Sequence, residues 1–69
     1  MMYNWKVTLV VQSTGREIVR SGDGGFDMEG YAKAEALGQV NSTVFWQGLP
    51  DDTYLKEIKT FPEVADGED

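Results

Sequence analysis

Apolar side chains occupy every second position near the start of the chain, which is the period of a β-strand with one buried face. A turn at 13–16 follows, because Gly15 can take a positive φ without a steric penalty. Residues 17–20 then predict a short return strand, which closes a β-hairpin. The alternating apolar residues of the first strand are Tyr3, Trp5, Val7, Leu9 and Val11.

A helical period begins after a glycine-rich connection. Apolar residues recur there at a spacing of four, and Tyr31 and Leu37 widen the stripe, which predicts a helix near residues 28–40. Alanines in the stripe favour the helix and permit a close approach to a sheet. The stripe consists of Met28, Ala32, Ala36 and Val40.

Both ends of this helix have local sequence signals. Asp27 is expected to be the N-cap, because its carboxylate can accept a backbone N–H of the first turn. Phe26 and Tyr31 then have the spacing of a hydrophobic staple. Asn41 is expected to end the helix.

The rest of the chain predicts an apolar loop over 44–52 and a last strand from Thr53 to Phe61, which Pro62 ends. The register of this strand stays open, because its apolar residues do not all fit one face. A β-bulge would reconcile them. One face would take Tyr54 and Ile58, and the other Leu55 and Phe61.

These elements follow one another in the order ββαβ. A right-handed crossover through the helix places the third strand on the far side of the first. The sequence therefore predicts an α+β fold, with one helix packed on a three-stranded antiparallel sheet of order 2-1-3. Residues 1–62 are expected to form this single domain, and residues 63–69 an acidic disordered tail.

The net charge of −6 is concentrated at the end of the chain. Residues 1–62 contain eight acidic and six basic residues, which leaves a net charge of −2. This nearly neutral body weighs against a fold that imitates the DNA backbone over its whole surface.

Histidine and cysteine are both absent, which removes the imidazole base, the thiolate and the common zinc ligands. We therefore expect neither an enzyme nor a cofactor. Asp23, Asp27 and Glu29 lack the spacing of a calcium loop, so no metal site is expected. No apolar run approaches the roughly 20 residues of a membrane helix, and the start does not resemble a signal peptide, so a cytoplasmic protein is expected.

The loop over 44–52 is the first candidate for contact with a partner. Large aromatic residues in a loop are common interface anchors, but they can equally close the end of a small core, and both interpretations stay open. The last strand is the second candidate, through strand addition. The candidate partner-binding residues are Phe45, Trp46, Leu49, Asp51, Asp52, Lys56 and Lys59.

Basic residues outnumber acidic ones on the strands, which predicts a mildly basic open sheet face. A nucleic-acid-binding module that uses this face is one alternative, although the overall negative charge opposes it. A homodimer that seals an exposed strand is the other, so a monomer or weak homodimer is expected. The charged strand residues are Lys6, Arg16, Glu17, Arg20, Lys56, Glu57 and Lys59.

The element order over residues 3–62, with an alanine-rich helix and a Pro-Asp-Asp turn into 54–59, resembles small bacteriophage-encoded host-takeover proteins. The resemblance implies an acidic inhibitor or adaptor in the host cytoplasm. Its partner would be a larger host protein complex, such as RNA polymerase or a CRISPR defence complex. The resemblance carries over no functional residue.

Overall fold

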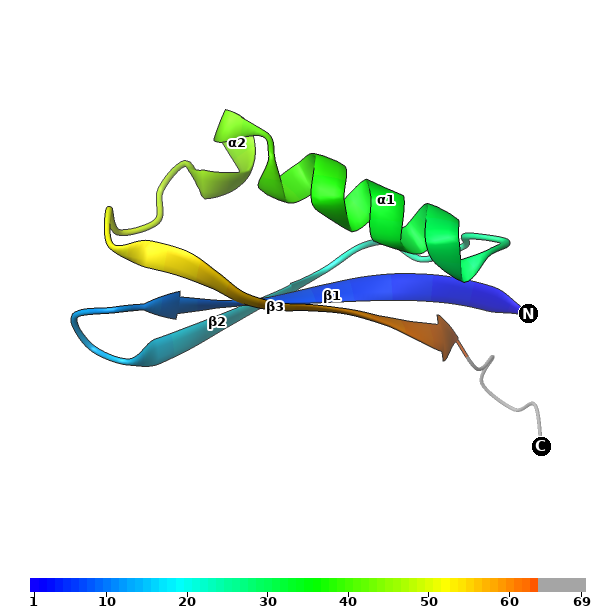
Figure 1. Cartoon of the computed structure of the whole chain (residues 1–69), viewed down its shortest axis with the longest axis horizontal. Helices are drawn as coiled ribbons and strands as arrows, with labels where there is room; N and C mark the ends of the chain where they lie inside the picture. The colour runs from blue at the N-terminus through cyan, green and yellow to red at the C-terminus, as the bar shows by residue number, and fades with distance from the viewer. Residues whose placement is uncertain (64–69) are drawn as a thin grey trace.

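The computed structural model describes residues 1–63, which form a three-stranded antiparallel sheet with one main helix along one face (Figure 1). The sheet order is β2-β1-β3, so the predicted α+β fold and its 2-1-3 order are confirmed. In chain order the elements are β1 (Met2–Val11), β2 (Arg16–Ser21), α1 (Glu29–Val40), α2 (Thr43–Trp46) and β3 (Thr53–Glu63).

The core lies between β1 and α1. Strand β1 is hydrogen-bonded on both sides, and Val7 and Leu9 on its helix-facing side are fully buried. Ala32 and Ala36 of α1 are fully buried against them. Because alanine side chains are small, α1 lies close to the sheet.

The predicted apolar stripe of α1 is only partly buried. Met28, Tyr31 and Leu37 are exposed, so only the alanines and the partly buried Val40 contact the core. A helix on a three-stranded sheet covers little area, and a narrow stripe of small residues is enough to dock it.

The helix α1 matches the predicted range of 28–40 to within one residue, but its predicted N-cap is wrong. Met28 is the N-cap residue, in an extended conformation, and no side chain caps the helix. Phe26 instead forms a bridge with Tyr3, with two backbone hydrogen bonds of 2.8 and 3.2 Å. With Met28 as the N-cap, Asp27 does not cap the helix, and Phe26 and Tyr31 do not occupy the two positions of a hydrophobic staple. Asn41 is the C-cap, as predicted.

Strand β3 contains the bulge that its sequence suggested. Leu9 lies opposite Leu55 and Thr8 opposite Glu57, so Lys56 is the extra residue. The bulge places Leu55 and Ile58 together on the helix-facing side, where both pack against the core. The predicted grouping of Tyr54 with Ile58, and of Leu55 with Phe61, is therefore wrong.

The last strand is longer than predicted. Pro62 lies opposite Tyr3 within β3, and Glu63 lies opposite Met2. The Glu63 carboxylate also accepts the backbone N–H of Gly25 at 2.8 Å, so this residue belongs to the domain rather than to a tail. The rest of the predicted tail, 64–69, lies outside the described residues.

Candidate functional site

The predicted apolar loop contains the one-turn helix α2, which turns its aromatic residues inward. Phe45 is only 7% exposed and belongs to the core. Trp46 packs edge-on against it, with ring centroids 5.5 Å apart, and its indole N–H donates to the Val40 carbonyl at 2.8 Å. The core interpretation therefore holds for Phe45, while Trp46 stays half-buried at the surface.

The second half of this loop lines a small cavity. Leu49 and Asp51 surround it with Trp46, and its volume is about 360 Å³. Asp52 points elsewhere, because its carboxylate accepts the backbone N–H of Ser13 at 2.7 Å. Hydrogen bonding from the Ser13 side chain and backbone lowers the pKa of Asp52. Asp52 thus ties the hairpin turn to the start of β3.

Lys56 and Lys59 lie on β3 and are each paired with a glutamate. The Lys56 ammonium lies 2.8 Å from Glu17, and the hydrogen bond to that carboxylate raises the pKa of Lys56. Lys59 lies 3.6 Å from Glu57. The seven predicted partner-binding residues therefore occupy three separate places and do not form one site.

The predicted basic face is wrong in its composition. Arg16 and Arg20 lie opposite Val11 and Val7, which places both arginines on the helix-facing side. The opposite face of the sheet, which we call the open face, has no helix over it in the described part of the chain (Figure 1). Its lysines are balanced in part by glutamates, and its exposed apolar residues are Met2, Val19, Tyr54 and Phe61.

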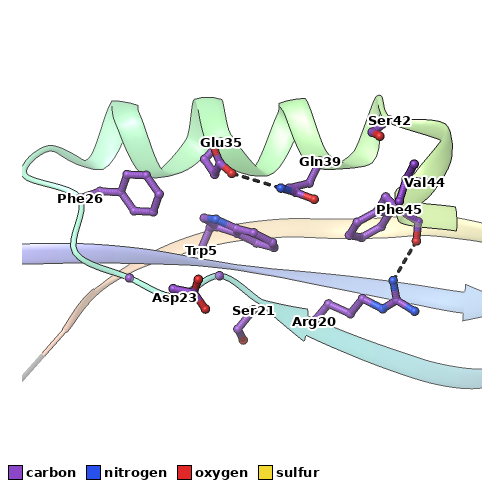
Figure 2. Close-up of a pocket in the computed structure, with 12 residues that line it drawn as sticks. Trp5, Arg20, Ser21, Asp23, Phe26, Glu35, Gln39, Ser42, Val44 and Phe45 are labelled. Atoms are coloured by element: carbon purple, nitrogen blue, oxygen red, sulfur yellow. Dashed lines mark hydrogen bonds between the residues drawn. The ribbon is translucent and has the colours of Figure 1, made fainter.

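A groove lies above β2, on the helix-facing side of the sheet. Helix α1 contacts β1 and β3, but within residues 1–63 it does not contact β2. The space left between β2 and the two helices has a volume of about 580 Å³ (Figure 2). We call it the β2 groove, and define it by Trp5, Arg20, Asp23, Phe26, Glu35 and Phe45.

Trp5 forms the floor of the β2 groove and depends on a glycine. The Trp5 side chain is only 5% exposed, and its indole N–H has no hydrogen-bond partner among the described residues. A Cβ added to Gly22 would lie 2.5 Å from Trp5 Cε2 and closer still to Nε1. Only glycine therefore lets the end of β2 pass the indole ring.

Arg20 is held at one end of the groove. Its Nη1 donates to the Phe45 carbonyl at 2.8 Å, and its guanidinium carbon lies 5.2 Å from the centre of the Phe45 ring. The ion pairs found in residues 1–63 involve other side chains, so no carboxylate pairs with Arg20 there. Because a guanidinium has five N–H donors, this fixed group keeps donors in reserve.

Charged side chains line the groove beside its aromatic residues. Figure 2 shows Asp23 on the side of Trp5 away from Arg20, and Glu35 above the indole ring. The Glu35 carboxylate already accepts a hydrogen bond from Gln39 at 3.1 Å. The groove therefore has a basic end at Arg20 and an acidic end at Asp23.

Strand β2, beside the groove, has an outer backbone edge that is not paired within the sheet. This follows from the way in which the backbone groups of β1 alternate between its two neighbours. The Trp5 carbonyl accepts the N–H of Gly22 at 3.2 Å, whereas the Gln12 N–H donates to the Asp52 carbonyl at 3.1 Å. Since alternate residues of a strand direct their backbone groups to opposite sides, odd-numbered β1 residues bond to β2 and even-numbered ones to β3.

This alternation defines which β2 groups point outward. Val7, Leu9 and Val11 lie opposite Arg20, Ile18 and Arg16, so these three β2 residues direct their backbone groups toward β1. The other residues of the pairing direct N–H and C=O groups away from β1, with no bond to any described residue. They are Glu17, Val19 and Ser21.

Sequence reasoning missed this arrangement. The predicted burial of Trp5 in the core is confirmed, but the groove above it is not foreseen, and the predicted place of Arg20 on the open face is wrong. The alternation of β1 with β2 could have placed Arg20 on the helix-facing side, and Gly22 sits in an evident glycine-rich connection. No local pattern shows that α1 leaves β2 uncovered.

Within the described residues, no helix is long and apolar enough to cross a membrane. The same residues contain no group of three or more histidine, cysteine, aspartate or glutamate side chains that could hold a metal ion. Comparisons with known protein families, with curated proteins and with solved structures find no match for this chain.

Proposed function

We propose that this chain is a non-catalytic protein-binding domain that takes an extended segment of its partner as a fourth strand on β2. The unpaired edge of β2 beside the β2 groove is the observation that supports this proposal. In strand addition, backbone hydrogen bonds provide affinity and pockets for alternate side chains provide specificity. Both features occur here along a single strand.

The resemblance to phage host-takeover proteins suggests the class of partner. An inhibitor or adaptor of this kind would bind a large bacterial protein complex in the host cytoplasm. Binding by strand addition needs no catalytic group, which agrees with a sequence that lacks histidine and cysteine.

Capture of partners from a bacterial lysate, with two variants at one position, tests the proposal. Val19→Pro removes an outward N–H of the β2 edge, whereas Val19→Thr keeps that N–H and the branched shape. We expect the wild-type chain and Val19→Thr to capture the same complex, and Val19→Pro to lose it while its spectrum stays folded. Capture of that complex by folded Val19→Pro would contradict the proposal.

A matched pair of tyrosines distinguishes edge binding from binding by the open face. Tyr54 on the open face is 48% exposed and Tyr31 on α1 is 60% exposed. We expect Tyr54→Ala and Tyr31→Ala both to keep the captured complex. Loss with Tyr54→Ala alone would assign the interface to the open face, and a gel shift at low salt would reveal nucleic-acid binding there.

A further inference from the structure

We infer that the partner strand on β2 places a carboxylate opposite Arg20, so that the guanidinium selects an acidic residue in the partner. This inference rests on the proposed strand addition. It adds the chemistry of the segment that is recognised, and it names the residue that recognises it.

The position of Arg20 in the sheet makes it a suitable selector. Arg20 lies opposite Val7 of β1, a buried residue on the helix-facing side. Cross-strand neighbours share a face and have Cβ atoms about 4.5–5.5 Å apart. A partner residue opposite Arg20 on the outer side of β2 would therefore lie on the same face, beside the β2 groove.

The guanidinium is oriented before any partner arrives. The hydrogen bond to the Phe45 carbonyl and the contact with the Phe45 ring hold it at this end of the groove. No carboxylate within residues 1–63 pairs with it, and the remaining donors can form a charge-assisted pair with one. Asp23 and Glu35 line the groove further along, which restricts the favourable position for an acidic residue to the Arg20 end.

A second copy of this chain does not supply that carboxylate. When β2 pairs antiparallel with its own copy about a two-fold axis perpendicular to the sheet, paired residues lie on the same face. Arg20 then lies opposite Ile18, Arg16 or Arg20 of the second copy, because Glu17 lies opposite Val10 on the open face. Self-pairing therefore leaves Arg20 without a counter-ion or opposite another arginine, which favours a different protein as the partner.

A peptide that reads the same in both directions tests the inference without knowledge of strand polarity. We suggest Lys-Thr-Val-Thr-Glu-Thr-Val-Thr-Lys, whose alternation puts the glutamate and two valines on one face. The matched control replaces the central glutamate with glutamine. Each is titrated into the isotope-labelled full chain, and backbone amide shifts are followed by NMR.

We expect the glutamate peptide to bind about tenfold more tightly than the glutamine peptide at low salt, since the bond to the guanidinium becomes charge-assisted. Arg20→Gln should abolish this preference, and Arg20→Lys should keep part of it. The preference of the wild-type chain should also shrink at high salt. The salt dependence of the wild-type chain tests the inference even if a variant at Arg20 fails to fold.

The outcomes separate the inference from the proposed function. Equal binding of both peptides, with shifts at the amides of Glu17, Val19 and Ser21, would overturn the carboxylate preference and leave strand addition in place. No shift at these amides with either peptide would contradict strand addition on β2 and the carboxylate preference with it.

Discussion

The two edges of the sheet differ in how they are protected. The outer edge of β3 carries a bulge at Lys56, and Pro62 occupies a position whose N–H would otherwise point outward. Helix α1 also packs on β3, and the Thr60 hydroxyl donates to Glu29 of α1 at 2.6 Å. Strand β2 contains no proline, pairs with β1 without a register shift and is not covered by α1.

The difference between the two edges indicates how a small domain can leave one edge free for a partner without self-association. Bulges, prolines and charged side chains are common means of blocking an edge. Strand β2 is limited by length instead, because only Glu17, Val19 and Ser21 direct backbone groups outward. Such an edge can hold one short segment but gives little support to extended self-association.

The largest expected effect is at the end of the open edge. Gly22→Ala puts a Cβ into the indole of Trp5, and overpacking of this kind costs about 1–3 kcal/mol of folding free energy. Gly30→Ala is the matched control, because no atom lies within 4 Å of the added Cβ and a helical glycine is replaced. It should stabilise the chain by up to about 1 kcal/mol. Urea denaturation measures both, and equal stability of Gly22→Ala and wild type would contradict the packing described here.

Removing the protection of β3 should make the two edges alike. Deletion of Lys56 restores an uninterrupted ladder with β1, because Leu55 and Glu57 keep their partners. Combined with Pro62→Val, it should yield concentration-dependent association in light scattering, whereas the wild-type chain stays monomeric. A double variant that remains monomeric at every concentration would show that the bulge and the proline do not protect this edge.

Much of the fold could be predicted from the sequence, because the signals are local. Alternation over β1, the helical period of α1 and a right-handed crossover are enough for the sheet order. The conflict between Leu55 and Ile58 pointed to the bulge. The capping residue of the helix could not be predicted in this way, because the bridge between Phe26 and Tyr3 just before it is a long-range contact.

The candidate site was less predictable than the fold. The β2 groove exists because Ala32 and Ala36 dock α1 over β1 and β3, and no pattern within β2 reports that lateral position. Large aromatic residues in the predicted loop made Phe45 a candidate either for partner contact or for the core, and the structure places it in the core. Packing between distant segments, rather than residue type, decides which side chains surround a groove.

A smaller effect is expected from the contact between α1 and the protected edge. Thr60→Val keeps the branched shape but removes the hydrogen bond to Glu29, which should cost about 0.5–1 kcal/mol. Val19→Thr, the corresponding exchange on the open edge, should change stability by less than about 0.5 kcal/mol. Thermal melting measures the stability of both variants. A larger loss of stability for Val19→Thr than for Thr60→Val would contradict this prediction.

The smallest effect is expected at the turn that joins the hairpin to β3. Hydrogen bonding from Ser13 makes the pKa of Asp52 lower in the folded chain than in the unfolded chain. Its contribution is therefore present above the unfolded pKa of about 3.9 and is lost as the pH falls through the folded value. The melting temperature of Asp52→Asn should lie slightly below wild type at neutral pH and converge with it in acid. A difference that grows in acid would contradict this assignment.

Hydrogen exchange at the two edges, with and without the glutamate peptide, tests strand addition most directly. In the chain alone, the amides of Glu17, Val19 and Ser21 should exchange rapidly, as should those of Ile58 and Thr60, which point outward from β3. With the peptide, only the three β2 amides should become protected. Protection of the β2 amides in the chain alone, or peptide-dependent protection of Ile58 and Thr60 instead, would contradict the account.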